Sequence, residues 1–310
     1  VVLESSSHAL AMHRLGEVEY DVGVWTNLTP EHLDYHGTID DYLEAKALLI
    51  RRAPVSILNR DDPHFERFKA AAQSTVSYGV DSSADWRARK VRETPAGIEF
   101  ELLHDGQSHT VFLPMPGSFN VYNALAALAA AQASGLELTS LLPRLGDFPG
   151  VPGRMQMIAS EPYRVVVDFA HTAPALEKAL QALRPTVTGR ILLVMGAAGE
   201  RDPGKRGPIG AAAAAGADLF FTEEDHRSEP LGPILDALQR GAVEAGADGE
   251  RISLIPDRSE AIRAALAQAR EGDLVLLAGK GHETTLERSN ETIPWDEAAE
   301  AARLLAELHG

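Results

Sequence analysis

The 310-residue chain contains no cysteine, which excludes disulfides, thiolate metal ligands and a cysteine nucleophile. It has no run of 18 or more apolar residues, so the sequence predicts no membrane-spanning helix. Basic residues are few: 29 Lys and Arg stand against 45 Asp and Glu, a net charge of −16 that argues against nucleic acid as a partner. Its first residues lack the basic and apolar pattern of a signal peptide. We therefore expect a cytoplasmic protein that binds neither membranes nor nucleic acid.

What is present is typical of a globular α/β protein, with 45% apolar and 24% charged residues. The length predicts about two domains, and the Pro- and Gly-rich segment 149–153 is the best linker, which gives domains 1–148 and 149–310. In the first domain we expect strands at 1–3, 21–25 and 55–59, short antiparallel strands within 75–113, and helices at 38–52 and 117–135.

The second domain alternates apolar strands with helices, which predicts a largely parallel, Rossmann-like sheet covered on both faces. The expected strands are 164–169, 190–196, 218–222, 251–256 and 273–279, and the expected helices lie near 174–185, 206–216, 230–244, 258–271 and 296–309.

Two segments near the start place polar residues after apolar strands. Val1–Leu3 leads to Glu4, and the strand 21–25 leads to a His-rich loop that contains His32. Because ligands of α/β sheets bind at the carboxyl ends of strands, both segments point to one site. A carboxylate with water ligands suits Mg²⁺. A capping or ion-pairing role for Glu4 is the alternative.

His32 and His36 lie four residues apart and could also be interpreted as a zinc pair. The zinc-protease pattern, however, requires Glu directly after the first His, and Leu33 stands there. The sequence therefore favours Mg²⁺ over zinc.

The segment from Gly199 to Lys205 fits the spacing GxxxxGK and follows an apolar strand. A phosphate-binding loop needs Ser or Thr next, but Arg206 occupies that position. A cationic loop that presents Arg201, Lys205 and Arg206 to anionic groups is the better interpretation.

Two further patterns are compatible with a nucleotide. Asn120 and Asn123 lie three apart on one helix face, where paired amides can bind an adenine edge or simply make helix-entry hydrogen bonds. Asp168 ends a strand, a position that suits a ribose hydroxyl.

Several strings, NLTPEHLDYHG, GSFNVYN, DFAHTAPALEKAL, GERDPGKRG and GKGHE, resemble the Mur ligases. The resemblance is strongest to those members that add the third amino acid of the peptidoglycan stem peptide. It covers essentially the whole chain, which would correspond to a central ATPase-type α/β domain without its phosphate loop, followed by the Rossmann-like C-terminal domain. This implies a monomeric ligase with ATP and Mg²⁺ as cofactors. The enzyme would join a diamino acid to UDP-N-acetylmuramoyl-L-alanyl-D-glutamate through an acyl phosphate.

The resemblance also implies roles for individual residues. The implied metal site comprises Glu4, His32 and a carbamylated Lys46, and the implied catalytic residues are Lys46, His32 and His171. ATP would contact Asn120, Asn123, Arg154 and Asp168. The nucleotide-peptide and amino-acid substrates would contact Ser6, Arg14, Arg201, Asp225, Arg227, Gly279 and Glu283.

The identity of the amino acid stays open at this point. The segment TEEDHR departs from the DNPR of the diaminopimelate-binding members, since Asp225 replaces Asn and His226 replaces Pro while Arg227 is kept. Arg227 would suit the second carboxylate of meso-diaminopimelate, whereas Glu224 and Asp225 would favour the ammonium of lysine or ornithine.

Two other classes remain. A cyanophycin synthetase-like enzyme or another Mur-type ligase shares parts of these strings. A non-catalytic substrate-binding fragment is the third possibility, because no GxxxxGK[ST] loop occurs in the chain. For the same reason we expect the 310 residues alone to be inactive.

Overall fold

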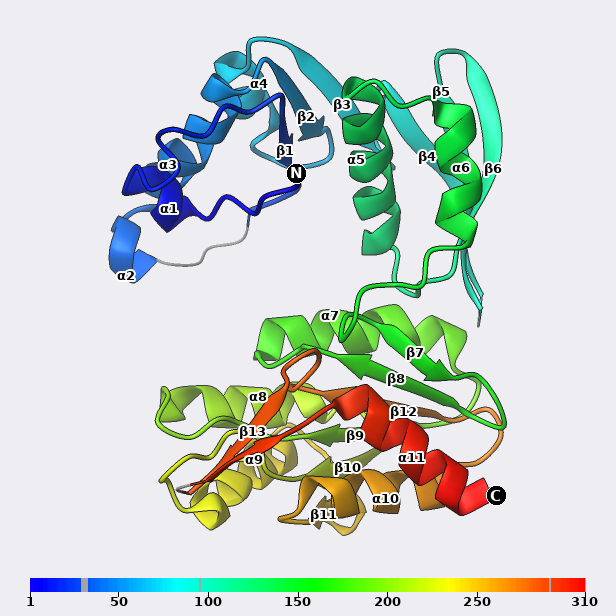
Figure 1. Ribbon diagram of the computed structural model, residues 1–310. Helices are drawn as coiled ribbons and strands as arrows, with labels where there is room; N and C mark the ends of the chain where they lie inside the picture. Colours follow the sequence, from blue (N-terminus) through cyan, green and yellow to red (C-terminus); the bar gives the residue numbers. More distant parts are fainter. Residues whose placement is uncertain (29–32, 95, 290, 310) are drawn as a thin grey trace. The chain divides into compact units, whose positions relative to one another are not determined.

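Figure 1 shows the protein as a computed structural model, which describes residues 1–28, 33–94, 96–289 and 291–309. The chain forms two compact units. The first comprises Val1–Arg92, Ile98–Pro114 and Ser118–Phe148, and the second comprises Glu93–Gly97, Met115–Gly117 and Pro149–Gly310. Within the described ranges, no helix is both long and apolar enough to cross a membrane.

The first unit is built on a six-stranded sheet whose strands follow one another in chain order. Strands β1 to β4 pair in parallel, and β5 pairs with β6 in antiparallel fashion. Asp105 and Gly106 both have positive φ in the β5–β6 turn, as a tight hairpin turn requires. The strands are β1 (Val22–Trp25), β2 (Val55–Asn59), β3 (Thr75–Gly79), β4 (Trp86–Thr94), β5 (Gly97–His104) and β6 (Gln107–Leu113).

The helices of this unit begin and end where local chemistry favours it. In the longest helix before β2, the Thr38 hydroxyl accepts a hydrogen bond from the Asp41 amide at 3.1 Å, and acidic residues occupy the first turn while Arg51 and Arg52 occupy the last. The helices are α1 (Ser7–Ala11), α2 (Leu33–His36), α3 (Ile39–Arg52), α4 (Phe65–Ala71), α5 (Phe119–Ala133) and α6 (Leu138–Gly146).

Trp25 lies at the centre of the core between α3, α4 and the sheet. Its ring stacks on Phe68 with centroids 3.8 Å apart, and Ile50 and Leu58 are fully buried beside it. Helix α5 packs against β1, β2 and β3. Each large apolar side chain removed from water in this way stabilises the unit by roughly 1.5–3 kcal/mol.

Two predictions for the first unit are wrong. Residues 1–3 form no strand, and Val1 and Val2 are fully exposed. Among the described pairings, no strand of the sheet pairs with them, and without ladder hydrogen bonds a three-residue segment does not offset its conformational entropy. Strand β3 is also not antiparallel to its neighbours, because α4 carries the chain back across the sheet between β2 and β3.

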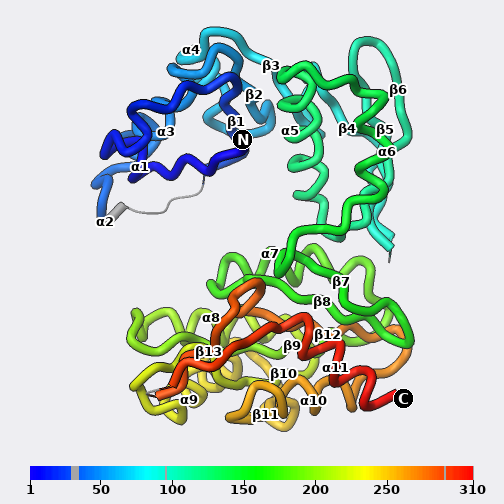
Figure 2. Tube along the Cα trace, in the orientation of Figure 1, coloured from blue at the N-terminus to red at the C-terminus, as the bar shows by residue number. Residues whose placement is uncertain are grey.

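The second unit has the expected largely parallel sheet, with strand order β11-β10-β9-β12-β8-β7. The Cα trace in Figure 2 shows the chain moving outward from β8 to β9, β10 and β11 before β12 returns between β9 and β8. Only β7, at one edge, is antiparallel to its neighbour. The strands are β7 (Gln156–Ala159), β8 (Arg164–Asp168), β9 (Ile191–Met195), β10 (Asp218–Phe221), β11 (Ile252–Leu254) and β12 (Leu274–Ala278).

Helices cover both faces of this sheet, so alternate residues of its central strands enter two separate cores. Val166 and Leu193 face α7, α8 and α9, whereas Val165 and Leu192 face α10 and α11. The helices are α7 (Ala173–Leu183), α8 (Arg206–Ala213), α9 (Leu231–Glu244), α10 (Arg258–Gln268) and α11 (Glu297–His309), with 3-10 turns η1 (Arg184–Thr186), η2 (Pro203–Lys205) and η3 (Gly249–Arg251).

A two-stranded hairpin, β13 (Thr285–Arg288) and β14 (Glu291–Pro294), forms a sheet of its own after β12. Neither β7 nor this hairpin is predicted by the sequence, because both are short and lack the continuous apolar run of the parallel strands. Residues of this hairpin contact two side chains that line the pocket of the second unit.

Candidate functional site

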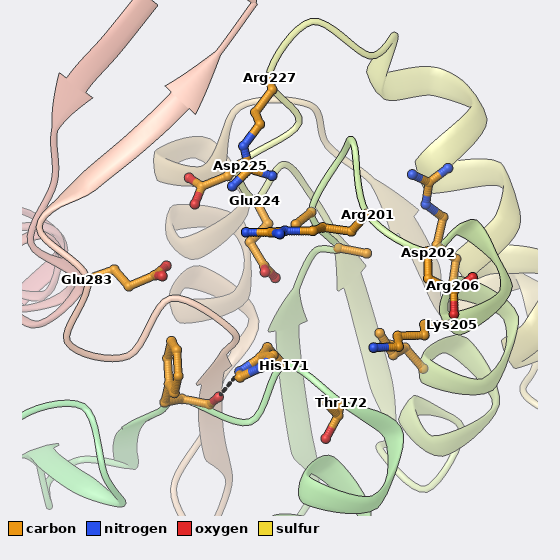
Figure 3. Close-up of a pocket in the computed structure, with 14 residues that line it drawn as sticks. His171, Thr172, Arg201, Asp202, Lys205, Arg206, Glu224, Asp225, Arg227 and Glu283 are labelled. Atoms are coloured by element: carbon orange, nitrogen blue, oxygen red, sulfur yellow. Dashed lines mark hydrogen bonds between the residues drawn. The ribbon is translucent and has the colours of Figure 1, made fainter. Parts of the chain in front are cut away.

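The loops that follow four strands of the second unit enclose a pocket of about 400 Å³. These loops leave the carboxyl ends of β8, β9, β10 and β12, beside the point where the strand order reverses, which is where open α/β sheets bind ligands. Figure 3 shows its lining. The charged or titratable residues that line it are His171, Arg201, Asp202, Lys205, Arg206, Glu224, Asp225, Arg227 and Glu283.

Two glycines allow these loops to approach one another. A Cβ on Gly199 would lie 2.1 Å from the carbonyl oxygen of His226, and the Gly199 amide donates to the Asp225 carbonyl at 2.8 Å. Gly279 has φ +105°, and a Cβ there would lie 2.5 Å from the Oε2 atom of Glu224. A side chain at Gly199 would push the two loops apart, whereas one at Gly279 would displace the Glu224 carboxylate and strain a left-handed backbone.

Lys280 lies fully buried beneath the acidic side of the pocket. Its Nζ atom is 2.8 Å from Asp225 Oδ1 and 2.7 Å from Glu283 Oε2. Asp225 and Glu283, which sequence reasoning assigns to the substrate, thus already share a cation. Lys280 is not among the residues predicted from the sequence, although its place inside the GKGHE string could have indicated a role.

Glu224 is the residue on this side whose charge is least compensated. It is 7% exposed, and its Oε2 atom has no hydrogen-bond partner among the described residues. Burial raises the pKa of Glu224 to about 7, reinforced by Asp225 and Glu283 and opposed by Arg258 and Lys280. In Figure 3 its carboxylate points into the pocket. From the sequence, Glu224 is predicted to favour the ammonium of lysine or ornithine, but its burial could not be predicted.

Three cationic side chains, Arg201, Lys205 and Arg206, also line the pocket. Arg206 is neutralised by Glu229, whose two carboxylate oxygens accept from Nη1 and Nη2 at 2.7 Å each. Within the part of the chain that the structure describes, Arg201 and Lys205 have no ion-pair partner, and Figure 3 shows the Arg201 side chain lying across the pocket. These two cations are therefore available to an anionic ligand group.

Arg227, in contrast, is engaged on two sides. Its Nε atom donates to Glu287 Oε2 at 2.7 Å and its Nη1 atom donates to the Gly199 carbonyl at 2.7 Å. The residue has φ +53°, a left-handed conformation held in part by its amide, which donates to the Glu287 carbonyl at 3.1 Å.

The loop after β8 is held by its own residues. Both carboxylate oxygens of Asp168 accept backbone hydrogen bonds, from Met155 at 2.8 Å and Ala170 at 2.9 Å, and burial raises its pKa. The guanidinium of Arg154 lies over the Phe169 ring at 4.7 Å. His171 contacts the Phe169 carbonyl through Nδ1 at 2.9 Å and lines the pocket.

The remaining candidate residues belong to the first unit. Ser6 caps α1 by accepting from the Ala9 amide at 3.2 Å, while Glu4 and Arg14 are exposed. Lys46 is half-buried on α3, with its ammonium 5.9 Å from the Tyr42 ring centroid. His32 lies outside the described residues, so the metal site as predicted is only partly visible. Among the described residues, no three or more His, Asp or Glu side chains group as metal ligands.

Asn120 and Asn123 contact each other on α5. The amide of Asn123 donates to Asn120 Oδ1 at 3.1 Å, and Asn120 is 4% exposed. Between them, the Tyr122 hydroxyl donates to Asp61 at 3.0 Å, and Asp61 also accepts the amides of the loop after β3. The asparagines therefore lie beside a network that holds the end of β2.

Comparison with known proteins places this arrangement in a family. Residues 1–131 match the Mur ligase middle domain and residues 153–281 match the Mur ligase glutamate ligase domain, so the chain belongs to the Mur ligase family. It is 48% identical, over 99% of its length, to the UDP-N-acetylmuramyl-tripeptide synthetase of Deinococcus radiodurans. It is 41% identical, over the same share, to the UDP-N-acetylmuramoyl-L-alanyl-D-glutamate–2,6-diaminopimelate ligase of Geobacillus kaustophilus.

A solved structure of a UDP-N-acetylmuramoyl-L-alanyl-D-glutamate–2,6-diaminopimelate ligase has the same fold, with a TM-score of 0.72 and 35% identity over 99% of this chain. The chain spans 63% of the Deinococcus relative, 65% of the Geobacillus relative and 64% of the solved chain. The expected combination of a Mur ligase middle domain and C-terminal domain is thus confirmed.

Proposed function

We propose that this chain forms the central and C-terminal parts of an ATP-dependent ligase of peptidoglycan precursor synthesis. The enzyme adds a diamino acid to UDP-N-acetylmuramoyl-L-alanyl-D-glutamate. The names of the relatives support this proposal, because they are tripeptide synthetases and diaminopimelate ligases at 41–48% identity.

The observation that carries the proposal is the charge distribution in the pocket of the second unit. Among the described residues, Arg201 and Lys205 on one side are cations without an ion-pair partner, and the buried Glu224 on the other has a carboxylate oxygen, Oε2, without a hydrogen-bond partner. An amino acid with a second amine matches both sides: its α-carboxylate meets the cations and its distal ammonium meets Glu224.

The reaction joins an amine to a carboxylate, which requires that the carboxylate first be activated. ATP supplies a phosphoryl group to the terminal carboxylate of the nucleotide-peptide, and the amino group of the diamino acid displaces that phosphate. In this proposal Asn120, Asn123, Arg154 and Asp168 bind ATP, and Ser6 and Arg14 bind the nucleotide-peptide. His171, at the edge of the pocket, helps to orient the reacting groups.

Glu4, His32 and a carbamylated Lys46 are proposed to hold Mg²⁺, which neutralises phosphate charge when bound. Glu4 fits this role, because its carboxylate is a hard oxygen donor and is exposed to solvent. Carbamylation converts the Lys46 ammonium, which would repel a cation, into an anion. We further propose that the enzyme is a cytoplasmic monomer that acts without nucleic acid or membrane partners.

The test is a ligation assay with the full-length enzyme, ATP, Mg²⁺, the nucleotide-dipeptide and each diamino acid, with the product identified by its mass. Arg201→Ala should raise the KM for the amino acid by about tenfold or more, because it removes a charge-assisted hydrogen bond. The control Arg144→Ala, at an exposed position on α6, should leave KM unchanged. Absence of an amide product from the wild-type enzyme would refute the proposal.

A further inference from the structure

The distal end of the pocket is defined by a contact between two segments 60 residues apart. The segment Glu224–Arg227 follows β10, and the hairpin β13–β14 follows β12. Arg227 and Arg288 form an isolated parallel bridge, and the Glu287 amide donates to Asp225 Oδ1 at 3.0 Å. The hairpin backbone therefore holds both Asp225 and Arg227 in place.

The side chain of Glu287 then determines what Arg227 can do. Its carboxylate accepts a hydrogen bond from Arg227 Nε at 2.7 Å, while the Gly199 carbonyl accepts one from Arg227 Nη1 at 2.7 Å. Arg227 is 23% exposed and Glu287 is 38% exposed, so this pair is partly shielded from water. Glu287 thus pairs with the charge of Arg227, and because Nε and Nη1 are both engaged, a second carboxylate could bind Arg227 through two parallel hydrogen bonds only by displacing one of these partners.

The other charges of the pocket also favour a ligand with a single carboxylate. Lys280 is shared between Asp225 and Glu283, and Arg206 is paired with Glu229. Among the described residues, Arg201, Lys205 and Asp202 on one part of the lining have no ion-pair partner, and neither has Glu224 on another part. The single Lys280 leaves one further net negative charge on Asp225 and Glu283. This set matches one carboxylate and one distal ammonium. A second carboxylate beside Glu224 and Glu287 would meet like charges instead of a free cation.

We infer that Glu287, by holding Arg227, makes this pocket selective for an L-diamino acid with a single carboxylate, the class of lysine and ornithine, over meso-diaminopimelate. The inference rests on the proposed function and specifies its substrate. Glu287 acts here as a positioning residue: it works through Arg227 rather than by touching the amino acid.

The experiment compares kcat/KM of the full-length ligase for L-lysine, L-ornithine and meso-diaminopimelate. For the wild-type enzyme, the better of the two monocarboxylates should exceed diaminopimelate by about 100-fold, because a buried charge without a partner is strongly disfavoured. Glu287→Gln should release Arg227 and reduce this ratio by about tenfold, chiefly through a lower KM for diaminopimelate. Glu291→Gln, at an exposed position on β14 of the same hairpin, should leave the ratio unchanged.

The double variant Glu287→Gln/Arg227→Ala separates a charge effect from a structural one. If Glu287 acts through Arg227, the gain with diaminopimelate should disappear in the double variant. A wild-type preference for diaminopimelate, or an unchanged ratio in folded Glu287→Gln, would overturn the inference while leaving the ligase function intact. Failure of the wild-type enzyme to ligate any of the three would instead reject the proposed function. If Glu287→Gln does not fold, the wild-type ratio decides alone.

Discussion

The guanidinium of Arg258 and the carboxylate of Glu297 form an ion pair that is completely buried in the second unit, with Nη2 and Oε1 2.6 Å apart. Arg258 also donates to the carbonyls of Glu223, at 3.1 Å, and Ala278, at 2.8 Å. These carbonyls lie just beyond β10 and at the end of β12. The pair therefore ties together two of the strand ends from which the pocket is built.

Arg258→Met should lower the free energy of unfolding by about 3–5 kcal/mol, because it leaves the Glu297 carboxylate buried without its cation. Arg263→Met is the matched control on the same helix: its partner Glu307 is exposed, and the loss should stay below about 1 kcal/mol. Denaturant unfolding of both variants measures the difference. Equal losses would show that the buried pair contributes no more than a surface one.

Glu224 should make stability fall as the pH rises. Its pKa is about 7 in the folded protein and 4.5 when unperturbed, so between these values the unfolded chain loses a proton that the folded chain keeps. The contribution is fully present below pH 4.5 and lost above pH 7, and it amounts to roughly 3 kcal/mol.

Glu224→Gln should remove this decline, so that its stability relative to the wild type increases from pH 5 to pH 8. Glu244→Gln, at an exposed position at the end of α9, is the control and should follow the wild-type profile. Thermal unfolding at several pH values provides the measurement. Parallel profiles for wild type and Glu224→Gln would contradict the raised pKa.

Asp61 should show the opposite sign. Partial burial acts to raise its pKa, but hydrogen bonds from Ser82, Val80 and Asp81 outweigh this and lower the pKa below its usual value of 3.8. The stability that it contributes is present above that value and is lost as the pH falls through the lower, folded value.

Asp61→Asn should therefore cost about 1–3 kcal/mol at pH 7 and less as the pH falls below the usual aspartate range. Asp147→Asn, at an exposed position after α6, should have no such effect. Urea titrations at neutral and acidic pH would detect the difference, and a cost independent of pH would exclude the carboxylate as its source.

Gly199→Ala should destabilise the second unit and weaken amino-acid binding. Its Cβ would lie 2.1 Å from the His226 carbonyl oxygen, so the loops after β9 and β10 would have to separate, and the Gly199 carbonyl would lose Arg227. Gly207→Ala on α8 meets nothing within 4 Å and should stabilise the helix by about 0.5–1 kcal/mol. Calorimetric unfolding of the two variants should therefore shift in opposite directions.

The sequence predicts the second unit well, because continuous runs such as 274–278 leave only a buried strand as an interpretation, and capping residues such as Asp257 mark where helices begin. The sequence wrongly predicts a strand at residues 1–3, and it does not predict strands β7, β13 and β14. There, strand formation depends on neighbours distant in the chain, which no local pattern encodes.

The sequence likewise predicts some residues of the site and misses others, because it does not show which distant segments meet. Arg201, Asp225, Arg227 and Glu283, drawn from three motif strings, line one pocket. Lys280 and Glu287, which pair with these residues, are missed, because Asp225 and Arg227 lie 55 and 60 positions away from them in the chain. Residue types at strand ends can be found from a sequence, whereas ion pairing between loops requires the fold.

The hairpin β13–β14 forms a sheet of its own, and its Glu287 is partly exposed where it meets Arg227, so this one side chain can change without replacing a residue of either six-stranded sheet. If Glu287 controls Arg227, substrate choice can change during evolution through a residue outside the strings by which the sequence resembles its family. Two homologues with identical residues at positions 224–227 could then build different cell walls. Assigning an amino acid to such a protein requires inspection of the residue opposite the arginine as well as the arginine itself.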